Sequence, residues 1–220
     1  MNFDFRLPEA DAILASVRSC HPRRLLDVGT GRGIITKEVA ALAPVIATEL
    51  FQCALQEAAQ RCPQSVCFVQ AHPSSLPFPD RYFDTVACTQ LIDHLETPVE
   101  RARVLAEVAR VLHPSGKAVF TVLHQNFRFD NFKKSKEGTD EGVYYHRYYV
   151  EEFQEQLERY WHIDYMQGIW TYLPKTYPIY TRLGRYVVYW ERIIRRTRLS
   201  LRYGKVLLAV CSPRESSVDT

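Results

Sequence analysis

Arg24-Leu25-Leu26-Asp27-Val28-Gly29-Thr30-Gly31-Arg32-Gly33-Ile34-Ile35 is the segment from which the architecture of this chain follows. Its apolar residues before Gly29 predict a short buried strand, and its three closely spaced glycines predict a tight turn. A helix that begins near Ile34 would direct free N–H groups and the positive end of its dipole at this turn. The segment therefore predicts a site for a polar, nucleoside-bearing cofactor at the end of a parallel strand.

The glycine spacing separates four interpretations of the turn. A phosphate-binding P-loop requires Lys-Ser/Thr after its last glycine, whereas Ile34-Ile35 follows Gly33. The dinucleotide fingerprint G-x-G-x-x-G would need its third glycine at the position of Ile34. A glycine-rich turn without a ligand stays open as the third interpretation. The observed D-x-G-x-G-x-G pattern from Asp27 to Gly33 resembles motif I of the class I S-adenosylmethionine-dependent methyltransferases.

A second acidic residue supports a nucleoside site. Residues 45–49 predict the next strand, and this strand ends in Glu49, 20 residues after Gly29. In βαβ nucleotide sites an acid at this offset accepts hydrogen bonds from the ribose hydroxyls. We therefore predict that Glu49 binds a ribose.

The rest of the chain alternates between helical and extended patterns. We expect helices over 8–20, 34–42, 51–61 and 98–112, and strands over 66–69, 83–88, 117–123, 163–167 and 206–210. Strands that alternate with helices predict an α/β fold with a doubly wound parallel sheet. In the helix over 98–112 we expect Val99, Ala102, Val104, Leu105, Val108 and Leu112 to face inward.

Three later segments extend the resemblance to the small-molecule branch of these methyltransferases. Residues 74–84 are similar to the family segment DLPFPDxSFD, residues 105–119 to E-ARVLKPGG, and residues 145–153 to H-R-Y-Y-T-x-E-E-L. The resemblance covers about residues 20–165 in unbroken order. It implies a Rossmann-like, seven-stranded, mostly parallel sheet with an antiparallel last strand. It also implies S-adenosylmethionine (SAM) as the methyl donor and a small-molecule acceptor.

The resemblance also assigns cofactor-binding positions. The turn residues would hold the methionine end of SAM, Glu49 the ribose, and three further residues the adenine and sulfonium region; these residues are Asp27, Gly29, Thr30, Gly31, Gly33, Glu49, Ser75, Leu76 and Gln90. The sequence departs from the family at Ala71-His72, where Gly-Asp is usual. A neutral histidine accepts one hydrogen bond but carries no negative charge. Adenine recognition would then depend on Ser74, Ser75 or the backbone near Leu76.

Three histidines are candidates for a general base. Methyl transfer needs a base only when the acceptor must lose a proton. His94 follows the fourth expected strand, His124 follows the fifth, and His146 lies in a later loop. A capping or surface role is the alternative for each of them.

Composition bounds the fold to one domain. With 220 residues, of which 46% are hydrophobic, we expect a single domain over 1–212, with a lid-like segment 124–147, a basic helical insert 172–203 and a flexible tail 213–220.

The net charge of +3 does not indicate nucleic-acid binding. The six cysteines form no C-x-x-C pair and have no zinc spacing, so we predict no metal site. Without a signal peptide or a long apolar run, we expect a cytoplasmic protein.

Residues 179–198 predict a basic amphipathic helix with an apolar stripe at helical spacing, formed by Ile179, Leu183, Val187, Trp190 and Ile194. Arginines surround the stripe at positions 182, 185, 192, 195, 196 and 198. Such a helix has three interpretations: a packed helix with a solvated face, contact with an anionic membrane or a lipid-like substrate, or contact with an acidic partner. A methyltransferase of RNA or protein, and a non-catalytic methyltransferase-like binding protein, stay as alternative functions.

Overall fold

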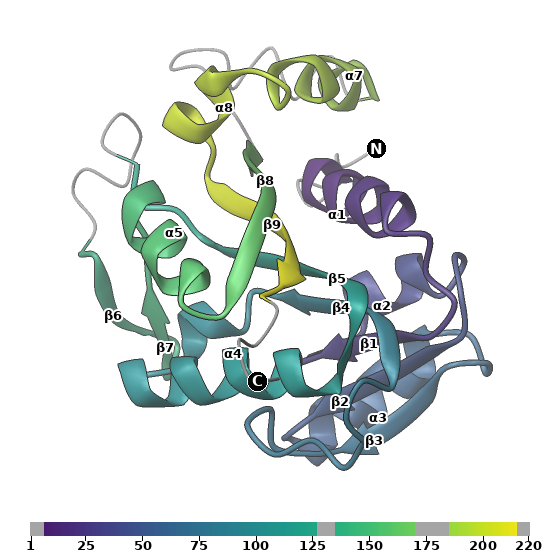
Figure 1. Cartoon of the computed structure of the whole chain (residues 1–220). Coiled ribbons are helices and arrows are strands. Elements are labelled where there is room, and N and C mark those ends of the chain that lie inside the picture. The colour runs from purple at the N-terminus through teal and green to yellow at the C-terminus, as the bar shows by residue number, and fades with distance from the viewer. Residues whose placement is uncertain (1–6, 127–134, 170–184, 215–220) are drawn as a thin grey trace.

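The computed structural model describes residues 7–126, 135–169 and 185–214. In this part of the chain, seven strands form one twisted sheet in the order β3-β2-β1-β4-β5-β9-β8 (Figure 1). The strands span Leu25–Val28 (β1), Val45–Glu49 (β2), Cys67–Gln70 (β3), Phe83–Thr89 (β4), Leu112–Leu123 (β5), Trp161–Ile169 (β8) and Val206–Pro213 (β9). β9 runs antiparallel to both of its neighbours, while β1 to β5 pair in parallel. The predicted doubly wound, mostly parallel sheet is confirmed.

The central strand β1 lies at the point where the winding of the sheet reverses. Leu26 of β1 pairs with Ile46 of β2 on one side and with Val86 of β4 on the other. The chain winds outward from β1 in both directions, so the connections after β1 and β4 diverge. In open α/β sheets such a switch point holds the ligand outside the carboxyl ends of the strands. The glycine turn directly follows β1, and Gln90 directly follows β4.

Helices cover both faces of the sheet. One face packs against α1 (Leu7–Ser19), α2 (Ile34–Val39) and α3 (Gln52–Arg61), and its core includes Ile13, Val39 and Cys62. The other face packs against α4 (Pro98–Val111) and α5 (Val150–Glu158), and its core includes Val104, Leu105 and Phe153. Because both faces are covered, the central strands are buried and largely apolar: all four β1 residues are buried, and Asp27 is the one polar residue among them.

The prediction for α4 needs one correction. Thr97 caps its first turn and Glu100 completes a capping box, so the helix begins firmly at Pro98. Its buried residues include Val104, Leu105 and Val108, but Val99 is 58% exposed. Val99 precedes Val104 by five residues and therefore lies on the opposite side of a helix with 3.6 residues per turn. Leu112 is buried as expected, but as the first residue of β5.

The segment predicted as a lid contains a hairpin that the sequence analysis missed. β6 (Glu137–Asp140) pairs antiparallel with β7 (Val143–His146). Glu141 and Gly142 between them both have positive φ, 49° and 83°. Positive φ at both central residues matches the twist of a two-residue hairpin. Residues 127–134 lie outside the described residues, and closure of this segment over a ligand stays a prediction.

The expected helix over 179–198 ends earlier than predicted, at Ile194, and a second short helix follows it. Residues 170–184 lie outside the described residues, α7 covers Arg185–Ile194, and α8 covers Arg198–Tyr203. The chain turns between them, where Thr197 N donates to the carbonyl of Ile194. Trp190, placed on the apolar stripe by its spacing, is 54% exposed. Figure 1 places α7 and α8 at the top of the molecule, with α7 beyond α1.

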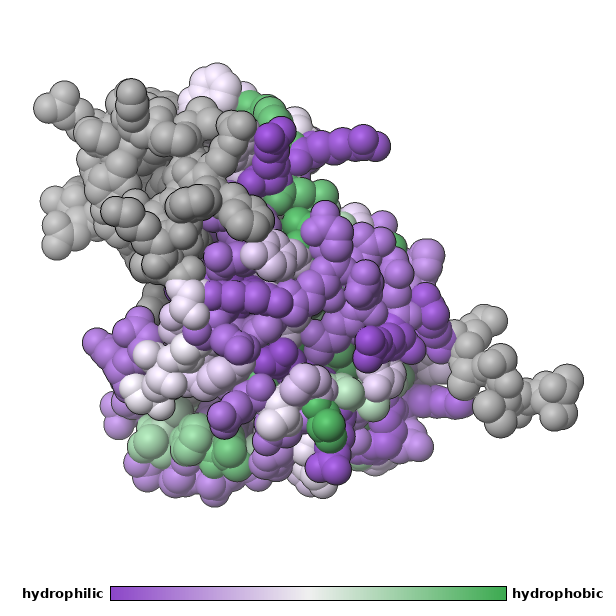
Figure 2. Space-filling view, turned by 90° about the vertical axis from the view of Figure 1, so that its left-hand side faces the viewer, coloured by the Kyte–Doolittle hydropathy of each residue, from purple (hydrophilic) through white to green (hydrophobic). Residues whose placement is uncertain are grey.

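The polar tail begins later than expected. Pro213 ends β9 and pairs with Trp161, and residues 215–220 lie outside the described residues. Figure 2 views the molecule from the side on which the β6–β7 hairpin lies, and most of the described surface there is hydrophilic. None of the helices in the described ranges is long and apolar enough to cross a bilayer.

Candidate functional site

The glycine turn leaves the carboxyl end of β1 and is tied to β2. The backbone N–H groups of Gly29 and Thr30 both donate to the carbonyl of Thr48, at 2.9 Å each. Gly29, Gly31 and Gly33 have φ angles of 74°, 52° and 74°, which L side chains rarely adopt. The turn therefore depends on glycine at all three positions, and α2 begins at Ile34, directly after Gly33.

The three glycines nevertheless have different surroundings. A Cβ atom on Gly33 would lie 2.9 Å from Ala58 Cβ, and one on Gly29 would lie 3.0 Å from a methyl group of Leu91. A Cβ atom on Gly31 would meet nothing within 4 Å. Gly33 and Gly29 are thus required by packing inside the protein, whereas Gly31 borders open space, as a residue that faces a ligand must.

Glu49 ends β2 beside this open space. Its Oε2 accepts from Gly31 N at 3.0 Å, and its Oε1 accepts from Leu50 N at 2.9 Å and Phe51 N at 3.1 Å. These three backbone donors hold the carboxylate in one orientation at the turn. A carboxylate oxygen can accept more than one hydrogen bond, so Glu49 retains the capacity to bind ligand hydroxyls.

Asp27 lies beneath the turn and is fully buried. Its Oδ2 accepts from Thr36 Oγ1 at 2.6 Å, while its Oδ1 has no hydrogen-bond partner among the residues that the structure describes. Burial raises the pKa of Asp27 to about 6, against 3.8 for the ordinary group, although hydrogen bonds from Thr36 and Thr30 act in the opposite direction. Thr30 and Thr36 also contact each other through their hydroxyls. Asp27 belongs to β1, just before the turn, and its carboxyl is directed into the protein, while its predicted role at the methionine end of the cofactor stays a prediction.

Gln90 stands at the end of β4 in a strained conformation. Its φ is 49°, and its N–H donates to both the carbonyl and the hydroxyl of Thr121. Its side-chain amide donates to Glu9 Oε1 at 2.5 Å. Positive φ in a residue other than glycine is often found at functional sites. This contact brings the first turn of α1 to the switch point. Nothing in the sequence predicted that Glu9 would bind Gln90, since a glutamate in the first turn of a helix is common.

Ser75 and Leu76 follow a tight loop after β3. Ser75 N donates to the carbonyl of His72, and Leu76 N donates to Glu107 Oε1 at 2.7 Å. The Leu76 side chain is buried in the core. The backbone donors at both positions are therefore engaged within the protein.

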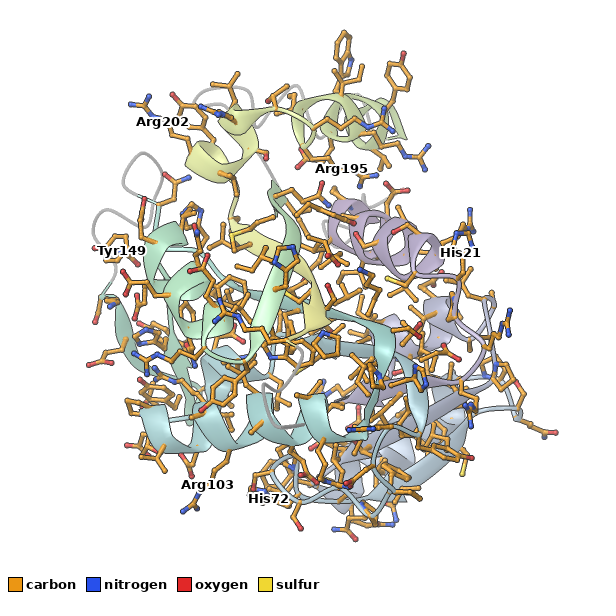
Figure 3. The ribbon with its side chains drawn as sticks, in the orientation of Figure 1. His21, His72, Arg103, Tyr149, Arg195 and Arg202 are labelled. Atoms are coloured by element: carbon orange, nitrogen blue, oxygen red, sulfur yellow. The ribbon has the colours of Figure 1, made fainter. Side chains whose placement is uncertain are left out.

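His72 organises this loop through its own ring. Its Nδ1 accepts from Ser74 N at 3.2 Å and lies 2.8 Å from Ser74 Oγ. The ring is exposed and lies at the bottom of the view in Figure 3. With Nδ1 as the acceptor, the neutral ring carries its proton on Nε2. His72 therefore presents a donor where the family's usual residue presents a carboxylate.

The three candidate bases have different partners. His94 is exposed, and its Nδ1 lies 2.8 Å from the carbonyl of Tyr144 in β7. His124 is buried with Nδ1 at 2.6 Å from the Gly204 carbonyl; burial lowers its pKa, although this hydrogen bond acts in the opposite direction. His146 is buried between two carboxylates, with Nε2 at 2.8 Å from Glu152 Oε1 and Nδ1 at 3.4 Å from Glu137 Oε2. Since both of its nitrogens face acceptors, His146 joins the hairpin to α5.

A buried arginine, which the sequence analysis did not predict, connects the β6–β7 hairpin to the loop after β4. Arg101 of α4 is 6% exposed and donates to the carbonyls of Leu95 and Glu96. It also donates to the Tyr144 hydroxyl at 3.1 Å, which fixes the hairpin against the loop after β4. The sequence feature that could have identified Arg101 is the presence of an arginine at a helix position that faces the core. In the described part of the chain, no group of three or more potential ligand side chains could hold a metal ion.

Comparisons with known proteins agree with this geometry. A family model of the methyltransferase domain matches residues 26–120. The biotin biosynthesis bifunctional protein BioHC of Cellvibrio japonicus is 34% identical over 101 residues, which cover 46% of this chain and 20% of that protein. The ubiquinone biosynthesis O-methyltransferase of Aromatoleum aromaticum is 31% identical over 111 residues, which cover 48% of this chain and 46% of that protein. The matches thus span less than half the length of these curated relatives.

Solved structures share the whole fold. The 1,6-didemethyltoxoflavin-N1-methyltransferase of Burkholderia thailandensis, solved with 1,6-didemethyltoxoflavin and S-adenosylhomocysteine, has a TM-score of 0.65 and 18% identity, and the match covers 94% of this chain and 77% of that one. The matched domain contains the glycine turn, Glu49 and Gln90, and the strand order agrees with a switch point at β1. The chain thus matches the methyltransferase domain family over residues 26–120, and it shares the fold of solved S-adenosylmethionine-dependent methyltransferases.

Proposed function

We propose that this protein transfers the methyl group of SAM to a small-molecule acceptor. The observation that carries the proposal is the pairing of Gly31 with Glu49. The turn has open space at Gly31, and the Glu49 carboxylate stands 3.0 Å from the Gly31 nitrogen at the same edge of the sheet. A nucleoside with free ribose hydroxyls fits this arrangement, because a carboxylate accepts hydrogen bonds from both hydroxyls.

The residues of the switch point fit the cofactor as a set. We assign the ribose to Glu49 and the methionine end to the turn that begins at Gly29, with Asp27 supporting the turn from below through Thr36. Gln90 and Leu91 lie between the turn and the end of β5, where the sulfonium would be placed. We keep Ser75 and Leu76 as neighbours of the adenine. Because both backbone donors are engaged and the Leu76 side chain is buried, we assign the polar contact to the side chain of Ser75. Bound SAM supplies a methyl group already activated by its sulfonium.

The acceptor is proposed to be a small molecule. The proteins named above include a ubiquinone biosynthesis O-methyltransferase and a 1,6-didemethyltoxoflavin-N1-methyltransferase solved with bound 1,6-didemethyltoxoflavin, which is a small molecule. The protein's part in such a reaction is to align acceptor and methyl group and to exclude water. The hairpin, held by Arg101 and His146, stands at the edge where the acceptor would approach.

For an acceptor that must lose a proton, we place the general base at His94. Its Nδ1 lies at hydrogen-bond distance from the Tyr144 carbonyl, so Nδ1 is the donor and Nε2 of the neutral ring carries the lone pair. The ring is exposed and follows β4 at the carboxyl edge. His146 is a weaker candidate, since both of its nitrogens face carboxylates. His94→Gln should lower the methyl-transfer rate about 100-fold or more without a matching loss of SAM affinity. An unchanged rate would remove His94 from the mechanism.

Calorimetric titration with SAM and with S-adenosylhomocysteine tests the proposed function. We expect both to bind, and the binding protein should then methylate members of a small-acceptor panel of phenols, acids and lipid-like alcohols. Absence of binding by a protein that is folded by circular dichroism would contradict the cofactor assignment and favour a non-catalytic role. Binding together with methylation of RNA or protein substrates, and of no small acceptor, would contradict the acceptor assignment.

A further inference from the structure

The outer surface of α7 and α8 exposes apolar and basic side chains together. Tyr189, Trp190, Ile193 and Leu199 are 60%, 54%, 45% and 56% exposed. Arg196, Arg198 and Arg202 are also exposed. We call these seven residues the α7–α8 face. Figure 2 shows green and purple atoms side by side at the top of the molecule, the level at which Figure 1 places both helices.

The opposite side of α7 is anchored to α1. Arg192 and Arg195 both bind Asp11, with Nη2 of Arg192 at 2.5 Å from Oδ1 and Nη1 of Arg195 at 3.0 Å from Oδ2. Glu191 is 3% exposed. Figure 3 shows Arg195 between the two helices. These contacts orient α7, so the exposure of Trp190 and Ile193 results from the packing and not from a loosely placed helix.

α8 is fixed on the sheet by a close backbone approach. A Cβ atom on Gly168 of β8 would lie 1.9 Å from the carbonyl oxygen of Ser200, so only glycine allows α8 to sit there. Gly168 N donates to Ser200 Oγ at 3.1 Å. Leu199 and Arg198, next to this anchor, therefore face outward from a fixed helix.

The charge of the face has one sign. Glu191 is the sole acidic residue between positions 185 and 203 of the sequence, and it is buried. In the described ranges no salt bridge joins Arg196, Arg198 or Arg202 to a carboxylate. The surface is therefore complementary to an anionic partner.

We propose that the α7–α8 face binds the surface of an anionic lipid bilayer. Tryptophan and tyrosine have an apolar body with a polar group and favour the interface between lipid and water. Isoleucine and leucine gain from insertion below the headgroups, and arginine pairs with lipid phosphates. A nucleic acid would satisfy the arginines but would offer nothing to Ile193 and Leu199, which cannot stack on bases.

The face is linked to the candidate site through the end of α8. The carbonyl of Gly204, which follows α8, lies 2.6 Å from Nδ1 of His124, and His124 follows β5 at the carboxyl edge of the sheet. A bilayer bound at the α7–α8 face would therefore lie near the edge where the acceptor is expected. Binding of the face to lipid requires neither SAM nor methyl transfer, so its test is independent of the proposed function.

Co-sedimentation with vesicles tests the proposal on the full chain without cofactor. We expect binding to vesicles of phosphatidylcholine mixed with phosphatidylglycerol, little binding to phosphatidylcholine alone, and weaker binding at high salt. Arg196→Gln with Arg198→Gln should weaken binding about 25-fold, since each arginine near an anionic surface contributes about 1 kcal/mol, or about five-fold. Trp190→Ala with Ile193→Ala should weaken binding about ten-fold or more.

Matched controls lie on α4, at the opposite end of the molecule in Figure 3. Val99→Ala removes an apolar side chain that is 58% exposed, and Arg103→Gln removes an exposed arginine. Both should bind vesicles like the parent protein, and the thermal unfolding of every variant shows that it is folded. Equal losses in the α4 controls, no binding to anionic vesicles, or tighter binding to single-stranded RNA than to vesicles would each overturn the proposal.

Discussion

The backbone nitrogen of Gly31 donates to Oε2 of Glu49 across 3.0 Å, which joins the turn after β1 to the end of β2. The two residues are 18 positions apart in the chain, and parallel pairing of the two strands brings them together. The contact places a fixed carboxylate beside the open space at Gly31. Cofactor affinity should therefore depend on Glu49 more than on any other single side chain of the turn.

Glu49→Ala should weaken binding of S-adenosylhomocysteine about ten- to a hundred-fold. The change removes hydrogen bonds to a charged acceptor, which contribute about 1.5–3 kcal/mol. Calorimetric titration measures the affinity, and thermal unfolding shows whether the fold persists. Glu155→Gln on α5 is the control, because Glu155 is an exposed acid on a helix that packs against the other face of the sheet from α2 and α3. Unchanged affinity in Glu49→Ala would refute the ribose assignment.

Gly31→Ala should mainly lower cofactor affinity, whereas Gly33→Ala should mainly lower the stability of the fold. Both place a side chain at positive φ, which costs about 1–2 kcal/mol. Only at Gly33 does the new Cβ also meet Ala58 and Cys62 at 2.9 Å, which adds about 1–3 kcal/mol of overpacking. Gly33→Ala should therefore unfold at the lower temperature, whereas Gly31→Ala should lose more cofactor affinity than its change in stability explains. Equal melting temperatures and equal affinities would contradict these assignments.

Asp27→Asn should change how stability depends on pH. The native carboxyl has a pKa of about 6 and the ordinary group one of 3.8, so the native state binds more protons between these values. The free energy of unfolding contributed by Asp27 therefore falls as the pH rises through this window. Relative to the parent, the variant should gain up to about 3 kcal/mol between about pH 4 and about pH 7. Urea unfolding at a series of pH values measures the difference, and a difference independent of pH would show that Asp27 is not the buried acid described.

Asp11→Asn should loosen α7 from α1. Although burial alone raises the pKa of Asp11, hydrogen bonds and charges from Arg192 and Arg195 outweigh burial and hold it below its usual value. The stabilisation is therefore present above pH 3.8, the ordinary pKa, and is lost as the pH falls through the lower native value. We expect a loss of about 1 kcal/mol at neutral pH and faster amide hydrogen exchange in α7.

The pair Arg32–Glu57 is the control for this prediction. Its side chains are 69% and 50% exposed, so water and salt screen the charges. Glu57→Gln should leave the free energy of unfolding nearly unchanged. If Asp11→Asn behaves like Glu57→Gln at neutral pH and α7 exchanges as before, the docking of α7 does not depend on Asp11.

Local patterns were sufficient to predict the turn and the parallel, doubly wound part of the sheet, whereas its antiparallel end was predicted from the family resemblance. The run Leu25 to Val28 followed by three glycines permits few conformations, and the order of strands and helices restricts the topology because crossovers are right-handed. The offset from Gly29 to Glu49 predicted which acid stands at the turn, since it depends on the length of one βαβ unit. The hairpin was missed because Glu141 adopts positive φ without being glycine or asparagine.

Apolar spacing alone could not predict which residues of α7 would be buried. Its helical repeat placed Trp190 on the packed stripe, but Arg192 and Arg195 bind Asp11, and this pairing turns a different side of the helix toward α1. The partner lies 181 residues earlier in the chain, so no local pattern records it. The contacts between Glu9 and Gln90 and between Gly168 and Ser200 also join distant parts of the chain, so no local pattern predicts them.

The sequence by itself determined the class of fold, the glycine turn and the acid that faces it, because these depend on steric limits of the backbone and on the length of one repeating unit. The tertiary structure alone decided that Gly31 borders open space while Gly33 is required for packing, that His146 is held between two carboxylates, and that Trp190 faces outward. Each of these depends on contacts between distant segments, whose geometry arises only when the whole core packs.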